Sequence, residues 1–171
     1  MRVESVEGEG TSFFLTLPLV PVAATAASAP ALPAPVPVVP GMRVLLAEDH
    51  EINQVLTTAM LDRLGARVVV ARDGAEAIAA VARAGDDPFA LVLMDMQMPG
   101  IDGLEATRRI RADGVGPDRL PIVALTANAF GEDVEACRRA GMQGHLAKPL
   151  GLAALAEVLR DWTAEAMARA A

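Results

Sequence analysis

Short apolar runs alternate with helix-like segments from residue 42 onward. The apolar runs occupy residues 43–47, 68–70, 89–94, 122–125 and 144–146. Segments typical of helices lie at residues 52–60, 78–81, 103–112, 134–140 and 152–162. Short apolar runs bounded by turn residues predict buried strands, and apolar spacings of three and four predict helices. This part of the chain therefore predicts five β–α units.

Strands that are apolar on both faces are typical of a parallel sheet with helices on each side. We therefore expect an α/β fold with a five-stranded, doubly wound parallel sheet. In such sheets ligands bind beyond the carboxyl ends of the strands, where the strand order reverses. The functional side chains should accordingly follow the strands.

Two further segments precede this region. Residues 1–19 contain two short strand-like runs around a Gly-Glu-Gly turn, and residues 20–41 are rich in Ala, Pro and Val. No charged residue occurs between Gly10 and Met42, but seven of the twelve prolines lie there. Proline is poorly tolerated in a lipid-buried helix. We therefore interpret residues 20–41 as an extended linker that leads to a domain at residues 42–171.

Composition narrows the possible partners. The net charge of −7 and the isoelectric point near 4.8 argue against nucleic-acid binding, which requires clustered Lys and Arg. Cys137 is the only cysteine, so an intramolecular disulfide is excluded and a reducing, cytoplasmic setting is expected. Glutamates occupy the positions where a signal peptide would carry positive charge. We expect no membrane contact by these residues.

Charged and hydroxyl side chains follow four of the five predicted strands. They are Glu48 and Asp49 after the first strand, Asp95 at the end of the third, Thr126 after the fourth and Lys148 after the fifth. Clustered carboxylates repel one another, so the site requires a hard divalent cation, and Mg2+ fits best. The ammonium and hydroxyl groups would bind the oxygens of a phosphoryl group. Asp95 would then be the nucleophile, which explains a charge at the end of a buried strand.

Four segments at these positions resemble the landmark segments of the receiver domain of two-component response regulators. They are AEDHEIN, LVLMDMQMPGIDGLEA, ALTANA and HLAKP, and the similarity covers residues 42 to about 168. The resemblance implies a flavodoxin-like fold with strand order 2-1-3-4-5. It also implies phosphorylation of Asp95 by a phosphohistidine donor, either a kinase dimerisation domain or a histidine phosphotransfer protein.

The same resemblance implies a role for each residue of the site. It implies a Mg2+ site formed by Glu48, Asp49, Asp95 and the backbone carbonyl of Gln97, contacts from Thr126 and Lys148 to the phosphoryl oxygens, and a cis peptide bond before Pro149. One position departs from the family. His145 stands where receivers usually carry a Tyr or Phe whose rotamer reports phosphorylation. We therefore do not expect an aromatic switch of the usual kind.

The segment VESVEGEGTSFFLTLPL carries a second resemblance, to the last strands of a histidine-kinase ATP-binding domain. Its Gly8-Glu9-Gly10-Thr11 stretch corresponds to the final glycine-rich turn of that domain. The resemblance implies that the chain comes from a hybrid sensor histidine kinase and contains a kinase remnant, a linker and a receiver. Because the kinase core is not among these residues, the expected role of the chain is that of phosphoryl acceptor.

Two other functions are compatible with parts of the pattern. A non-phosphorylated interaction module with the same fold is the main alternative, and the intact set of acidic residues and Lys148 argues against it. An aspartate-nucleophile phosphohydrolase would need a second Asp two residues after the nucleophile, where this chain has Gln97. We therefore expect Mg2+-dependent phosphoryl acceptance in a phosphorelay.

Overall fold

The computed structural model contains two compact units, Met1–Pro33 and Ala34–Ala171. It describes residues 2–6, 8, 10–16, 41–127 and 131–170, and side chains are described for all of these except 131–132 and 163–170. Apart from Gly41, the linker predicted at residues 20–41 lies outside the described residues.

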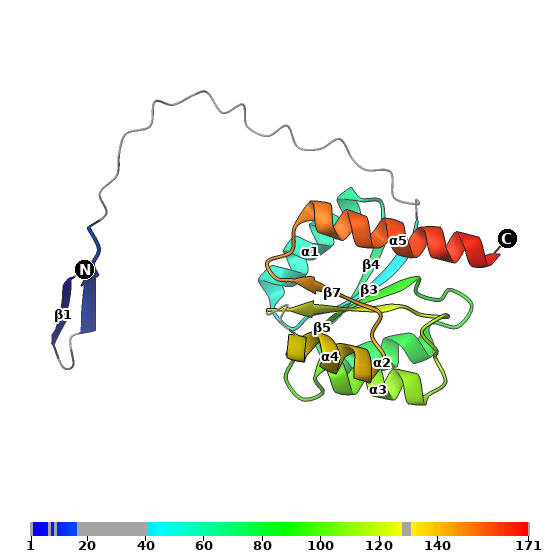
Figure 1. The fold of residues 1–171 in the computed structure, drawn as a ribbon, viewed down its shortest axis with the longest axis horizontal. Coiled ribbons are helices and arrows are strands. Elements are labelled where there is room, and N and C mark those ends of the chain that lie inside the picture. Colours follow the sequence, from blue (N-terminus) through cyan, green and yellow to red (C-terminus); the bar gives the residue numbers. More distant parts are fainter. Residues whose placement is uncertain (1, 7, 9, 17–40, 128–130, 171) are drawn as a thin grey trace, which may run out of the picture. The chain divides into compact units, whose positions relative to one another are not determined.

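The second unit is built on a five-stranded parallel sheet (Figure 1). Its strands are β3 (Arg43–Ala47), β4 (Arg67–Ala71), β5 (Leu91–Asp95), β6 (Ile122–Thr126) and β7 (Gly144–Ala147). Their order, β4-β3-β5-β6-β7, confirms the predicted α/β fold and the 2-1-3-4-5 arrangement. β3 pairs with β4 on one side and with β5 on the other. The strand order therefore reverses between β3 and β5, where doubly wound sheets bind their ligands.

Five helices follow these strands within the described part of the chain. They are α1 (Glu51–Arg63), α2 (Gly74–Arg83), α3 (Gly103–Ala112), α4 (Gly131–Ala140) and α5 (Leu152–Ala170). α1 and α5 cover one face of the sheet, and α2, α3 and α4 cover the other (Figure 1). Asp73 and Asp102 cap α2 and α3 by accepting hydrogen bonds from backbone N–H groups. None of the helices described has the length and apolar character needed to cross a bilayer.

Successive residues of β3 point to opposite faces of the sheet and join different cores. Val44 and Leu46 pack with residues of α1 and α5, whereas Leu45 and Ala47 pack with residues of α2 and α3. β5 and β6 are buried over their whole length. Asp95 is the one charged residue within these two central strands. The sequence of β5 thus places one charge at the end of an apolar strand, at the carboxyl edge of the sheet.

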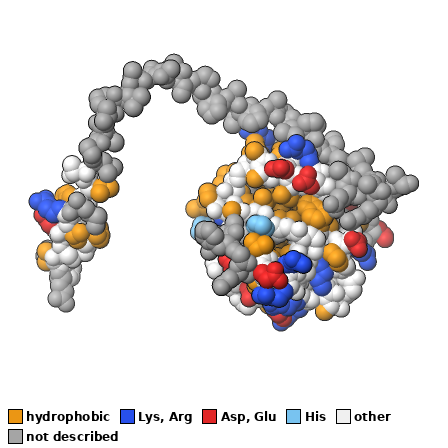
Figure 2. Space-filling view, in the orientation of Figure 1, with side chains coloured by type: hydrophobic (Ala, Val, Ile, Leu, Met, Phe, Trp, Pro, Cys, Tyr) orange, Lys and Arg blue, Asp and Glu red, His pale blue; other side chains and the backbone are white. Residues whose placement is uncertain are grey.

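Three of the apolar residues at helical spacing in α1 lie on its exposed side, whereas Met60 packs against the core. Ile52, Val55 and Leu56 are 71%, 66% and 49% exposed, whereas Thr57 and Leu61 are buried. Hydrophobic side chains accordingly reach the surface where α1 lies, at the left edge of the second unit in Figure 2. The spacing located the helix correctly, but it did not identify the side that contacts the sheet.

The first unit contains an antiparallel hairpin of β1 (Arg2–Val6) and β2 (Gly10–Phe14). These strands lie where the sequence predicts two strand-like runs. Val3 lies opposite Phe13, and both side chains are exposed. An isolated two-stranded hairpin is at best marginally stable in water, because it buries little apolar surface.

Candidate functional site

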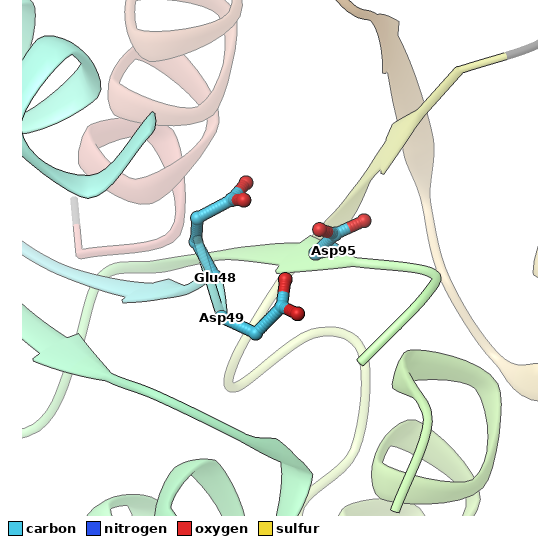
Figure 3. A group of neighbouring side chains, drawn as sticks. All are labelled: Glu48, Asp49 and Asp95. Carbon is cyan, nitrogen blue, oxygen red and sulfur yellow. The ribbon is translucent and has the colours of Figure 1, made fainter. Parts of the chain in front are cut away.

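Three carboxylates meet where the strand order reverses (Figure 3). Glu48 and Asp49 directly follow β3, and Asp95 is the last residue of β5. One carboxylate oxygen from each residue lies within 4.8 Å of the others. The sequence places these residues only at strand ends. The parallel pairing of β3 with β5 brings them together.

The three carboxylates line a cleft of about 420 Å³ at the carboxyl edge of the sheet. All five side chains that the sequence places after strands line this cleft, namely Glu48, Asp49, Asp95, Thr126 and Lys148. Thr126 ends β6 and is buried, and Lys148 directly follows β7. The four predicted strand ends therefore contribute to one site.

Lys148 bridges two of the carboxylates. Its Nζ lies 2.6 Å from Oε2 of Glu48 and 2.6 Å from Oδ2 of Asp95. Glu48 is 1% exposed and Asp95 is 6% exposed. Buried carboxylates are costly unless they are paired, and here one ammonium group pairs both. The backbone N–H of Lys148 also donates to the Thr126 carbonyl at 2.8 Å, which holds the base of the lysine beside β6.

The surroundings of Asp95 and Lys148 shift both of their pKa values. Burial raises the pKa of Asp95, although hydrogen bonds from Lys148 and from the Gln97 backbone N–H oppose the shift. Burial alone would lower the pKa of Lys148, but its bonds to Asp95 and Glu48 outweigh burial and raise that pKa. The lysine is therefore a permanent positive charge beside the carboxylate predicted to act as the nucleophile.

Two amide side chains of α1, to which the sequence pattern assigns no role, also bind Glu48. Nδ2 of Asn53 donates to Oε1 of Glu48 at 2.8 Å, and Nε2 of Gln54 donates to the Glu48 backbone carbonyl at 2.7 Å. Asn53 also lines the cleft. Asn53 is the last residue of the landmark segment AEDHEIN, and both residues lie in the first turn of a helix that follows an acidic strand end.

The loop after β5 is fixed by close backbone contacts. The N–H of Gln97 donates to Oδ1 of Asp95 at 3.2 Å, and the N–H of Gly103 donates to the Met96 carbonyl at 3.2 Å. Gly103, the first residue of α3, lies directly against β5. A Cβ at this position would overlap the Asp95 carbonyl oxygen, so the close contact requires glycine. The role predicted for the Gln97 carbonyl, as a metal ligand, stays a prediction.

The remaining predicted residues lie on either side of Lys148. The peptide bond between Lys148 and Pro149 is cis, as the family resemblance implies. His145 lies in β7 opposite Ala124 of β6, and its side chain is exposed rather than part of the cleft lining. The switch role considered for the His145 position stays a prediction.

The side chains of the cleft suit a hard divalent cation. Glu48, Asp49 and Asp95 all offer carboxylate oxygens, the ligands that Mg2+ prefers, and these oxygens lie close enough to share one ion. Asp49 is exposed, so its carboxylate is accessible from solvent. The arrangement can combine a carboxylate nucleophile with a bound cation and a fixed ammonium group.

Sequence comparison identifies relatives of this chain among signalling proteins. The family model of the response regulator receiver domain matches residues 44–160. The virulence sensor protein BvgS of Bordetella bronchiseptica is 39% identical over 174 residues, an alignment that covers 96% of this chain and 14% of BvgS. The chain thus spans about one-seventh of the length of this curated relative.

Solved structures resemble the second unit. The receiver domain of sensor histidine kinase PA1611 from Pseudomonas aeruginosa, which has a magnesium ion coordinated in its active site cleft, is 44% identical. The match has a TM-score of 0.63 and covers 71% of this chain and 97% of that chain. The receiver domain of Saccharomyces cerevisiae Ssk1, crystallised with the histidine phosphotransfer protein Ypd1, is 30% identical. That match has a TM-score of 0.65 and covers 72% of this chain and 89% of that chain.

Proposed function

This chain belongs to the response regulator receiver domain family, and from that membership we propose that it accepts a phosphoryl group on Asp95 within a phosphorelay. The observation that carries this proposal is the bridge from Lys148 to Glu48 and Asp95, beside Asp49. A module that only binds other proteins would gain nothing from charges buried at the end of two strands, since burying them costs stability.

In the proposed reaction, a carboxylate oxygen of Asp95 attacks the phosphorus of a phosphohistidine side chain. The O–P bond forms while the P–N bond breaks, and the bonding electrons leave with the imidazole nitrogen, which takes up a proton. Lys148 and Thr126 bind oxygens of the transferring group, so positive charge and a hydrogen-bond donor are already in position. The product is an acyl phosphate on Asp95.

We propose that Glu48, Asp49, Asp95 and the Gln97 backbone carbonyl form the Mg2+ site of this cleft. The bound ion would supply positive charge that offsets repulsion between the carboxylates and the phosphate oxygens. The magnesium ion in the cleft of the PA1611 receiver supports this assignment. Asp49, which is exposed, is placed to meet an arriving ion, whereas Glu48 already holds Lys148.

We propose that the phosphodonor is a histidine-bearing phosphotransfer domain that docks on the exposed side of α1. This helix begins two residues after Asp49, so the exposed Ile52, Val55 and Leu56 lie near the cleft. A shallow depression lies among these apolar side chains. Contiguous exposed apolar patches mark protein interaction sites. The complex of the Ssk1 receiver with Ypd1 supports a partner of this kind.

We infer that the chain is the receiver part of a hybrid histidine kinase. The PA1611 receiver belongs to a sensor histidine kinase, and the BvgS alignment covers so much of this chain that it extends well into residues 1–41. This supports residues 1–19 as the end of a kinase ATP-binding domain, residues 20–41 as a linker and residues 42–171 as the receiver. Such a receiver would act in the cytoplasm, where the kinase obtains ATP.

Labelling with a small phosphodonor tests the proposed function. Acetyl phosphate with Mg2+ should label the chain once, on Asp95, and the label should be alkali-labile because it is an acyl phosphate. Asp95→Asn should abolish the label, and Asp49→Ala should slow labelling by about tenfold or more, because it removes a ligand of the cation. Labelling that does not need Mg2+, or equal labelling of Asp95→Asn, would contradict the mechanism and favour the non-phosphorylated module.

A further inference from the structure

The two carboxylate oxygens of Glu48 have different partners. Oε1 accepts a hydrogen bond from Nδ2 of Asn53 at 2.8 Å, and the backbone N–H of His50 approaches the same oxygen at 3.4 Å. Oε2 accepts from Nζ of Lys148 at 2.6 Å. One oxygen is therefore held by α1 and the loop before it, and the other pairs with the ammonium group of Lys148.

Asn53 reaches Glu48 from a well-anchored part of α1. Next to it, the side chain of Gln54 donates to the Glu48 backbone carbonyl at 2.7 Å, and the backbone N–H of Gln54 donates to the His50 carbonyl at 3.0 Å. The terminal torsion of a Glu side chain is broad, so its carboxylate can present either oxygen unless one of them is held. The amide of Asn53 supplies that constraint.

The bond from Asn53 to Glu48 does not cap the helix. A capping side chain accepts hydrogen bonds from the first N–H groups of a helix, whereas Asn53 donates to a side chain outside α1. His50, which occupies the N-cap position, makes no side-chain capping bond. The Asn53 amide is therefore directed at the cleft, which it also lines.

We propose that Asn53 is a positioning residue for the cation site. By engaging Oε1 of Glu48 it keeps Oε2 turned toward the cleft, where that oxygen pairs with Lys148 or shares a divalent cation. This inference rests on the proposed function, because the cation is the one used in phosphoryl transfer. Without Asn53, Oε1 of Glu48 loses its shortest hydrogen bond and keeps only the long contact from the His50 N–H, so the carboxylate is held less firmly. Such outer-shell losses typically weaken metal binding about 10–100-fold.

Titration with MgCl2, followed by backbone amide NMR shifts near the cleft, tests the proposal without any phosphoryl transfer. Asn53→Ala should raise the Mg2+ dissociation constant about tenfold. Gln54→Ala is the matched control, since it removes the neighbouring amide, which binds only the backbone of Glu48. We expect it to change the dissociation constant by less than about twofold.

A double-mutant cycle shows whether Asn53 acts through Glu48. In the Glu48→Gln background, Asn53→Ala should weaken Mg2+ binding by less than about twofold, because the carboxylate it positions is already gone. Additive effects would overturn the proposal, and so would a wild-type constant for Asn53→Ala or an equal loss in Gln54→Ala. If the wild-type protein binds Mg2+ but acetyl phosphate does not label it, the proposed function fails while the Asn53 result stands.

Discussion

Asp95 carries the one charge of the two central strands, and its neighbours explain how the fold accommodates it. Lys148 and the Gln97 backbone N–H donate hydrogen bonds to its two oxygens. The effect of burial on the pKa of Asp95 is nevertheless larger than that of these hydrogen bonds, so the pKa is raised. A carboxyl group whose pKa rises on folding costs stability at neutral pH. We interpret this loss of folding stability as the consequence of keeping a nucleophilic carboxylate at a buried strand end.

Asp95→Asn should therefore stabilise the protein at pH 7. A raised folded-state pKa means that the wild-type protein loses stability as the pH rises from the unfolded carboxyl pKa through the folded one. The asparagine variant has no such loss, and Glu48 still pairs the Lys148 ammonium group, so the advantage of the variant should be on the order of 1 kcal/mol at neutral pH and shrink in acid. Urea unfolding between pH 4 and pH 8, without divalent cations, measures the difference.

The control for this prediction is Asp86→Asn. Asp86 is exposed, so this variant should change the unfolding free energy by less than about 0.5 kcal/mol at any pH in the range. A less stable Asp95→Asn protein at pH 7 would contradict the prediction. A stability difference that does not vary with pH would contradict it as well.

α1 has two sides with different roles. Leu61 and the C-cap residue Leu64 face the core formed with β3 and α5, and Ile52, Val55 and Leu56 remain exposed. The first turn also holds Glu48 through Asn53. One helix thus joins the core, the cleft and the proposed docking surface.

Substitution of Ile52 and Val55 together by Gln should separate docking from chemistry. The exposed side chains contribute little to folding, so the unfolding free energy should change by about 0.5 kcal/mol or less per site. Transfer from a histidine phosphotransfer protein should slow by about tenfold or more, because apolar contacts at an interface centre are lost. Labelling by acetyl phosphate should stay at the wild-type rate. Radiolabel transfer measured with both donors checks this.

Leu61→Ala, on the opposite side of α1, is the contrasting variant. It creates a cavity in the core and should cost about 2–5 kcal/mol of unfolding free energy. If the Ile52 and Val55 substitutions slow labelling by both donors equally, the exposed side of α1 is not a docking surface.

Gly103→Ala should disturb the junction between β5 and α3. A Cβ at Gly103 would overlap the Asp95 carbonyl oxygen, so α3 must shift and the unfolding free energy should fall by about 1–3 kcal/mol. Acetyl phosphate labelling should also slow, since the shift moves Asp95. Gly116→Ala is the matched control: its Cβ would meet no atom within 4 Å. We expect it to be neutral or slightly stabilising in thermal unfolding, and a neutral Gly103→Ala would refute the close contact.

At the scale of the whole molecule, deletion of residues 1–41 should leave the thermal midpoint of the receiver nearly unchanged. The hairpin and the receiver belong to different compact units, and the described hairpin strands are exposed throughout. The sequence from residue 20 to residue 41 also lacks a periodic apolar stripe. Thermal unfolding of both proteins, followed by circular dichroism, makes the comparison. A large fall in the midpoint would mean that residues 1–41 complete the core of the receiver.

The sequence by itself determined the elements and the chemical types of the site. Apolar runs and helical spacings located five strands and five helices. For most of these elements the reason is that burial on one face or two produces a periodic pattern of apolar residues, whereas most of the apolar pattern of α1 is exposed. Parallel strands share a carboxyl edge, so side chains after those strands had to gather there. The sequence alone therefore assigns five side chains to one site, namely Glu48, Asp49, Asp95, Thr126 and Lys148.

Only the tertiary structure decided which of these groups touch and which sides of the helices are covered. The bridge from Lys148 to Glu48 and Asp95 depends on side-chain reach from the end of β7, past β6, to the ends of β5 and β3. The contact from Asn53 to Glu48 depends on how α1 is rotated about its axis. That rotation also exposes the apolar residue Val55. The spacing of residues along a chain fixes their angles around a helix, but the direction that meets the sheet is set by packing against distant segments.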